Sequence, residues 1–174
     1  MGIIWLVSPY IAYYISTRNN QKKQKVLSSE KEYVKEIAFK TWQFFKEHIN
    51  ETGNFLPPDN YQESRKEKVA YRTSPTNIGL GLLSVISAFD LGFIEYEECV
   101  DTIGKMLETI DKLQKWNGHL YNWYNTKTLE PLNPKFISTV DSGNLVGYLY
   151  VLKQGLIRHR RERCPRCSAN RHAR

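Results

Sequence analysis

Two irregular stretches of the sequence end alike, each in a cluster of hydroxyl, amide and charged side chains directly before an apolar segment. The first cluster is Arg72-Thr73-Ser74-Pro75-Thr76-Asn77, and the second is Ser138-Thr139-Val140-Asp141-Ser142-Gly143-Asn144. Such side chains can cap a helix N-terminus, where backbone N–H groups lack partners and one cap contributes about 1 kcal/mol. Capping would not need an arginine, two asparagines and an aspartate. The clusters therefore also predict binding of a polar ligand at helix N-termini.

A run of aromatic residues precedes the second cluster. Residues 116–124 read Trp-Asn-Gly-His-Leu-Tyr-Asn-Trp-Tyr. Aromatic rings can stack on the apolar face of a sugar while Asn, His and Tyr side chains bind its hydroxyls. We expect the four rings to line a sugar-binding cleft: Trp116, Tyr121, Trp123 and Tyr124. The alternative is that the rings pack into the core. His119 has no second histidine or carboxylate at metal-ligand spacing, so we expect neither a metal nor another cofactor.

The spacing of apolar residues predicts the helices that must position these groups. Residues 30–49 and 95–115 have one apolar stripe, whereas 76–91 and 141–156 are apolar on most sides. The long irregular stretches 50–75 and 116–140 separate them. This order of outer and inner helices is typical of an all-α fold, a partial (α/α)6 barrel of which about two hairpins are present. A four-helix bundle is the alternative, but its helices would each keep a polar face.

The N-terminal residues 1–16 contain no charged side chain, and lysines follow at positions 22, 23 and 25. A membrane span needs about 20 apolar residues, so we expect the end of a transmembrane helix whose beginning is missing. The positive-inside rule then places residues 17–29, a polar linker, on the cytoplasmic side. The alternative is an apolar helix packed on the domain that follows.

The charges are concentrated at the C-terminus. The chain carries a net charge of +7, and residues 157–174 hold seven arginines, no lysine and one glutamate. The rest uses mostly lysine, so we expect 157–174 to be a frameshift or other artefact and the fold to end near Leu156. We expect no nucleic-acid partner. The alternative is a nucleic-acid or zinc binder, although Cys164 and Cys167 provide at most half of a zinc site.

Four ordered blocks carry a family resemblance: residues 55–63 (FLPPDNYQE), 72–80 (RTSPTNIGL), 121–124 (YNWY) with 129–132 (LEPL), and 138–145 (STVDSGNL). Residues 30–156 resemble the central glucoamylase-like region of bacterial cyclic β-1,2-glucan synthases. The resemblance implies an (α/α)6 barrel with transglycosylase activity on β-1,2-glucan, within a large inner-membrane enzyme. Residues 1–16 resemble the last membrane span before that region.

The resemblance implies a fragment that contributes part of a β-glucan-binding cleft and is inactive alone. Glycoside chemistry needs two carboxylates at a defined separation, and we expect the principal pair outside this segment. Asp59, Glu63 and Asp141 are supporting candidates. The side chains expected to bind β-1,2-glucan are Asp59, Asn60, Gln62, Arg72, Thr73, Ser74, Asn77, His119, Tyr121, Asn122, Trp123, Asp141, Ser142 and Asn144. The alternative from another class is a membrane-tethered helical interaction module without catalysis.

Overall fold

The computed structural model of this 174-residue chain describes residues 2–16 and 27–163. The chain divides into two compact units, Met1–Val34 and Lys35–Arg174. Helix α2, Ser28–His48, begins in the first unit and continues into the second. The helix therefore starts inside the segment that was predicted as a linker, most of which lies outside the described residues.

The first unit contains helix α1, Gly2–Ser16, with Pro9 inside it. From Leu6 onward its apolar side chains are exposed, including Tyr10 and Ile15. Within residues 2–16 and 27–163, no helix has the length and apolar character needed to cross a membrane. The expected transmembrane helix is thus not supported by the structure.

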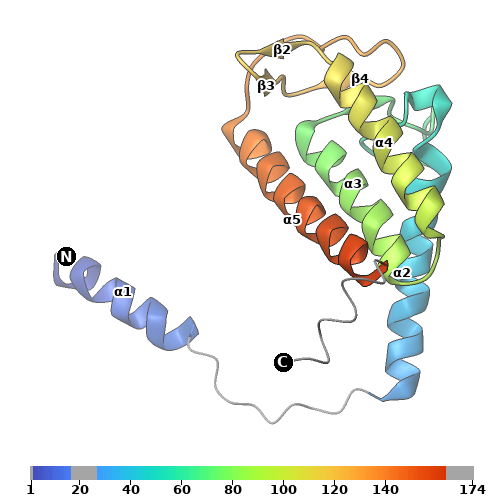
Figure 1. The fold of residues 1–174 in the computed structure, drawn as a ribbon. Helices are drawn as coiled ribbons and strands as arrows, with labels where there is room; N and C mark the ends of the chain where they lie inside the picture. The colour runs from blue at the N-terminus through green and yellow to red at the C-terminus, as the bar shows by residue number, and fades with distance from the viewer. Residues whose placement is uncertain (1, 17–26, 164–174) are drawn as a thin grey trace. The chain divides into compact units, whose positions relative to one another are not determined.

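The second unit is mainly helical, as predicted. After α2 come the 3-10 helix η1 (Glu51–Gly53), α3 (Pro75–Asp90), α4 (Tyr96–Lys112) and α5 (Thr139–Arg163). Figure 1 shows that α2 and α4 run toward the end where the short strands lie, and that α3 and α5 start from that end. Both long irregular stretches therefore enter a helix N-terminus at one end of the unit, which is the predicted arrangement.

Local sequence explains where α3 begins and ends. The Ser74 hydroxyl accepts a bond from the Asn77 backbone N–H at 3.2 Å, and Pro75 occupies the first turn, where its missing N–H costs nothing. Gly92, with a φ of 73°, follows the last turn and donates its N–H to the Phe89 carbonyl at 3.0 Å. A capped start and a left-handed glycine at the end thus fix the length of the helix.

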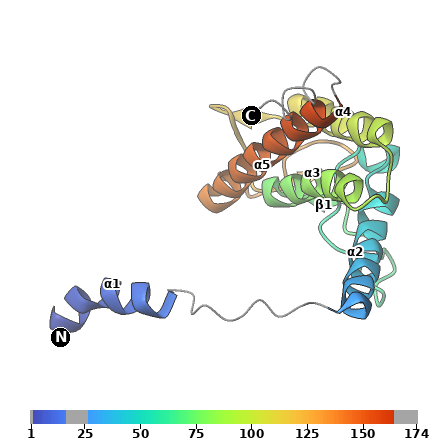
Figure 2. The same ribbon diagram turned by 60° about the horizontal axis from the view of Figure 1, so that its bottom comes forward.

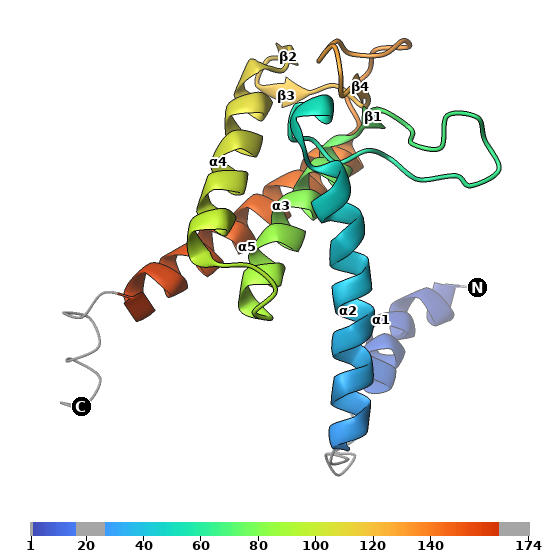
Figure 3. The same ribbon diagram turned by 90° about the vertical axis from the view of Figure 1, so that its right-hand side faces the viewer.

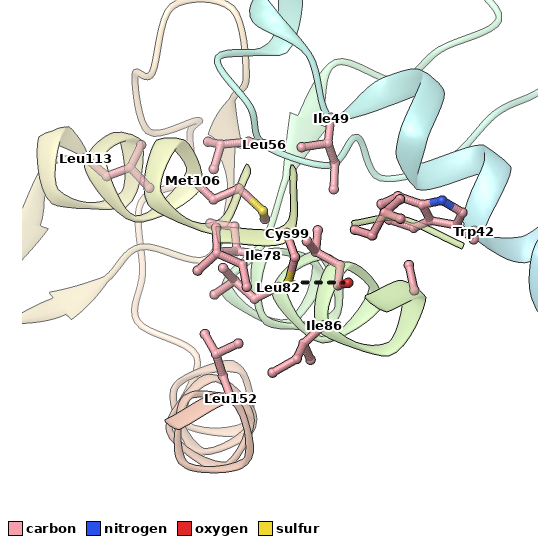
Figure 4. Close-up of a cluster of buried hydrophobic side chains, with 14 of the residues drawn as sticks. Trp42, Ile49, Leu56, Ile78, Leu82, Ile86, Cys99, Met106, Leu113 and Leu152 are labelled. Carbon is pink, nitrogen blue, oxygen red and sulfur yellow. Dashed lines mark hydrogen bonds between the residues drawn. The ribbon is translucent and has the colours of Figure 1, made fainter. Parts of the chain in front are cut away.

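The core lies between the helices and includes the segment after η1 (Figure 4). Ile78, Leu82 and Val85 of α3 are fully buried beside Met106 of α4 and Leu56 of the irregular stretch. The Cys99 thiol is also buried and lies 4.0 Å from the Val85 carbonyl oxygen. The apolar stripe of α4 faces this core, as its spacing predicts.

Helices α3 and α5 lie side by side, as Figures 1 and 2 both show. Their separation is set at Gly79, because a Cβ atom built there would lie 2.2 Å from Cδ2 and 3.0 Å from Cγ of Tyr148. Leu152 of α5 is buried in the core next to this contact. Only glycine lets the Tyr148 ring lie directly on the α3 backbone.

The prediction that both inner helices are buried on most sides is right for most of α3 and wrong for α5. On α5, Val146, Tyr150 and Val151 are exposed, with 67%, 65% and 55% of their surface accessible. Helix α5 packs on α3 along one side, and these three apolar side chains stay accessible within the described residues. An apolar sequence shows that a surface tends to be buried, but not which segment buries it.

Short strands occur where only irregular structure was predicted. Strand β1 (Arg72–Thr73) pairs with β4 (Tyr124–Asn125), and β2 (Lys115–Trp116) pairs with β3 (His119–Leu120), both antiparallel. The turn between β2 and β3 has positive φ at Asn117 and Gly118, as a tight hairpin requires. Two-residue strands leave almost no alternation in the sequence, so periodicity could not reveal them.

The fold does not end at Leu156, because α5 continues to Arg163. His159 is buried, its Nε2 lies 2.8 Å from Oδ1 of Asp90, and its ring packs edge-on against Phe89 at 4.8 Å. The same Asp90 oxygen accepts a bond from Arg158 Nη2 at 2.6 Å. The first residues of the arginine-rich segment therefore belong to the packed unit. That residues 157–174 come from a frameshift or other artefact stays a prediction.

Replacing Gly79 with alanine should lower the free energy of unfolding by about 1 kcal/mol or more. Overpacking against Tyr148 costs about 1–3 kcal/mol and exceeds the gain in helix propensity. Gly147→Ala in α5 is the matched control, since nothing lies within 4 Å of a Cβ there. It should raise the free energy of unfolding by about 0.5–1 kcal/mol. Urea unfolding of both variants measures this, and changes of the same sign would contradict the proposed close contact.

Replacing His159 with alanine should lower the free energy of unfolding by about 1–2 kcal/mol, because the buried ring loses its polar contact with Asp90 and its aromatic contact with Phe89. Arg160→Ala is the control on the next, exposed position of the same helix. Thermal and urea unfolding followed by circular dichroism compare the two. Equal stability of both variants would show that the segment after Leu156 does not stabilise the fold.

Candidate functional site

Asp59 is positioned by the irregular stretch that follows α2. Pro57 is buried against α3 at Gly81, where an added Cβ would lie 2.8 Å from the proline Cγ. The Asp59 backbone N–H then donates to the Ala70 carbonyl at 3.2 Å. Because Pro57 touches α3, Asp59 is held near the N-terminal turns of that helix.

The Asp59 carboxylate collects four hydrogen bonds from this chain. Oδ2 accepts from Nε and Nη2 of Arg72 at 3.0 and 2.8 Å and from Nδ2 of Asn60 at 3.0 Å. Oδ1 accepts from Nδ2 of Asn77 at 3.3 Å. A carboxylate has about four acceptor positions, so Asp59 orients these donors. With Gln62, which donates to Oδ1 of Asn60 at 2.9 Å, these residues form the Asp59 cluster.

Trp123 joins the Asp59 cluster through Arg72. The guanidinium carbon of Arg72 lies 4.7 Å from the centroid of the Trp123 ring, within cation–π distance. The pairing of β1 with β4 holds the two in place, because Arg72 is opposite Asn125 and Thr73 is opposite Tyr124. Arg72 is half exposed and Trp123 is partly buried. A planar cation and an aromatic ring therefore meet at the surface.

A second group of polar residues, the Asp141 cluster, links the first turns of α3 and α5. Thr76 donates its hydroxyl to Oδ1 of Asp141 at 2.5 Å and accepts a bond from Nδ2 of Asn144 at 3.2 Å. Ser138 caps α5 by accepting the Asp141 N–H at 3.2 Å. Thr76 and Asn77 are adjacent, so the two clusters form one polar surface across two helix N-termini.

Three residues of the predicted set have hydroxyl groups that are buried or that cap a helix. Ser74 is the α3 N-cap and is buried, and Thr73 is fully buried in β1. The hydroxyl oxygens of Thr73 and Ser142 are buried and have no hydrogen-bond partner among residues 2–16 and 27–163.

The aromatic run divides between core and surface. Tyr124 is fully buried, donates its hydroxyl to the Gln114 carbonyl at 2.6 Å and accepts the Tyr121 N–H at 2.7 Å. Asn122 is also buried, and its Oδ1 accepts the Phe136 N–H at 3.4 Å. The prediction that Tyr124 faces a cleft is therefore wrong. Asn122 holds the loop in the structure, and Tyr121 is partly buried against Tyr124.

Two other predicted residues lie apart from the two clusters. His119 is exposed on β3, and Glu63 is exposed in the loop between η1 and β1. In the part of the chain that the structure describes, neither forms a hydrogen bond or ion pair with the Asp59 or Asp141 cluster. Thr76, which belongs to the Asp141 cluster and is adjacent to Asn77, was not in the predicted binding set. The position of Thr76 next to Asn77, in the first turn of the predicted helix, could have identified it from the sequence. In residues 2–16 and 27–163, no three His, Cys, Asp or Glu side chains gather as a metal site would require.

A comparison with known protein families shows to which family this chain belongs. Residues 36–162 match the family described as "Protein of unknown function (DUF3131)". The chain belongs to the DUF3131 family. The match contains all four sequence blocks, and it extends past Leu156 into the arginine-rich segment, in agreement with the packing of His159.

The resemblance to cyclic β-1,2-glucan synthases is confirmed. Over 149 residues, 85% of this chain, the DUF3131 protein is 46% identical to the cyclic β-(1,2)-glucan synthase NdvB of Rhizobium meliloti (strain 1021). The chain spans only 5% of that relative's length. The identity therefore relates one segment of the synthase to this chain.

Solved structures show the fold. An endo-β-1,2-glucanase from Chitinophaga pinensis, in complex with sophorotriose and glucose, has a TM-score of 0.59 at 16% identity, over 71% of this chain and 31% of the glucanase. A glucoamylase-like protein of Bacteroides fragilis (NCTC 9343) has the same TM-score at 15% identity, over 75% and 32%. The DUF3131 chain thus has part of a glucoamylase-like helical fold.

Tyr124→Phe should lower the free energy of unfolding by about 1–2 kcal/mol at pH 8, because two buried hydrogen bonds are lost. Burial raises the pKa of Tyr124 to about 12, above about 10 in the unfolded chain. The folded state thus favours the neutral phenol, and this contribution is complete below pH 10 and lost as the pH rises toward 12. Urea unfolding at pH 8, 10 and 11 should show the difference between wild type and variant shrinking. A difference in the free energy of unfolding that does not change with pH would contradict the raised pKa of Tyr124.

Proposed function

We propose that this chain forms part of the glucan-binding cleft of an (α/α) barrel that acts on β-1,2-glucan within a larger cyclic β-1,2-glucan synthase. The observation that carries the proposal is the polar surface formed by the joined Asp59 and Asp141 clusters, with Trp123 at its edge. The 46% identity to a synthase of this product supports β-1,2-glucan as the substrate class.

The cleft binds sugar with an aromatic ring and with oriented donors. Trp123 offers an apolar face for a pyranose ring, and the half-exposed Arg72 donates to its hydroxyl groups. Asp59 and Asp141 already accept bonds from this chain, so they position Arg72, Asn77 and Thr76. The carboxylates that break and form glycosidic bonds therefore lie in another part of the larger enzyme, and this chain alone is inactive.

The proposal also includes attachment of the chain to a membrane through α1. Helix α1 exposes Leu6, Tyr10 and Ile15, and residues 22, 23 and 25 are lysines. We propose from this composition that α1 associates with the bacterial inner membrane, and that the helical unit after it lies on the cytoplasmic side.

The proposal is tested by binding of sophorotriose, a β-1,2-linked trisaccharide, to the full chain in calorimetric or NMR titrations. Trp123→Ala should weaken binding about fivefold, since one aromatic contact contributes about 1 kcal/mol. The melting temperature should stay nearly unchanged, because Trp123 is only partly buried.

Trp116→Ala is the matched control, because Trp116 is 55% exposed on β2, outside both clusters. It should leave sophorotriose affinity unchanged, and a β-1,3-linked trisaccharide should bind more weakly to the wild type. Unchanged affinity of the Trp123→Ala variant together with a much lower melting temperature would assign Trp123 to the core and reject the proposed cleft.

A further inference from the structure

A cavity adjoins the Asp59 cluster. It has a volume of about 690 Å³ and lies between the loop of residues 60–72 and the turn that contains Asn125 and Lys127. This loop is the wide excursion between η1 and β1 in Figure 3. The volume is within the range of about 300–1,000 Å³ that is usual for small-molecule sites.

The lining of this cavity is strongly basic. Arg65, Lys66 and Lys68 come from the loop, and Lys127 comes from the opposite side, whereas Glu67 is the only acidic residue that lines it. Arg72 also lines the cavity, but its charge is paired with Asp59. The cavity therefore carries a positive charge contributed from two segments that are distant in sequence.

Apart from Arg72, the cations that line this cavity have no acidic partner in the described part of the chain. Elsewhere in the second unit, lysines pair with carboxylates, as Lys40 does with Glu36 and Lys105 with Asp101, both at 2.7 Å. Among the described residues, no carboxylate forms an ion pair with any of the four cations from the loop and the turn. Like charges around one cavity repel each other unless an anion binds.

The same cavity has groups suited to a sugar. Asn60 and Gln62 belong both to its lining and to the Asp59 cluster, so the two sites are continuous. The Tyr71 ring also lines it, and Lys127 Nζ lies 3.7 Å from the centroid of that ring. Amide groups can bind hydroxyls and the ring can pack on a sugar face.

We propose that this cavity binds a saccharide that carries an anionic group, with the anion held between Lys127 and the loop cations. The anionic group lies in the basic cavity, and the sugar extends toward Asn60 and Gln62. The inference rests on the proposed function for the sugar part of the ligand, and on the unpaired cations for its charge.

The test compares glucose 6-phosphate, glucose and inorganic phosphate in NMR or calorimetric titrations of the full chain. Glucose 6-phosphate should bind at least about tenfold more tightly than glucose, and its affinity should fall with added salt because exposed charges are screened. It should also bind more tightly than inorganic phosphate, since the sugar contacts Asn60 and Gln62.

Lys68→Gln and Lys127→Gln, on opposite sides of the cavity, should each weaken glucose 6-phosphate binding about fivefold. Lys153→Gln on α5 is the matched control, because Lys153 is exposed and does not line the cavity. Circular dichroism should be the same for all three variants, since the substituted side chains are at the surface.

Equal affinity for glucose and glucose 6-phosphate would overturn the proposal, and so would an equal loss in the Lys153→Gln variant. Inorganic phosphate that binds as tightly as glucose 6-phosphate would overturn the saccharide part. Trp123-dependent binding of sophorotriose without binding of glucose 6-phosphate would reject this inference and leave the proposed function standing.

Discussion

The contact between Gly79 of α3 and the ring of Tyr148 in α5 sets the spacing on which the polar surface depends. Because the two helices approach this closely, their first turns lie near enough for Thr76 to donate to Asp141 at 2.5 Å. A larger residue at position 79 would push α5 outward and separate this pair. Packing in the helix interior thus determines the geometry at the helix N-termini.

The second constraint comes from the long loops, which are tied to each other by backbone pairing. Strand β1 ends the first loop and β4 lies within the second, so their pairing brings Arg72 and Trp123 together. The Asp59 carboxylate then fixes the Arg72 guanidinium with two hydrogen bonds. Two loops that are irregular in sequence thereby present a defined arrangement of a ring, a cation and several amides.

The apolar side of α5 is exposed, and the solved structures with the same fold are longer than this chain. Val146, Tyr150 and Val151 are apolar and accessible, and this chain corresponds to 31% of the glucanase with the same fold. Apolar side chains on an exposed helix face are usually covered by another surface. The proposed function assigns ligand binding to the polar surface at the helix N-termini and not to the apolar side of α5.

The sequence by itself determined the helices, their order and the polar clusters at the starts of α3 and α5, because apolar spacing and capping residues act within a few turns. It also carried the family resemblance in four blocks. Only the tertiary structure decided that Tyr124 and Asn122 are buried while Trp123 meets Arg72, since neighbours in an aromatic run differ only in the direction that the β1–β4 pairing gives them. It also decided that α5 extends beyond Leu156, because the burial of His159 depends on Phe89 and Asp90, far away in the sequence.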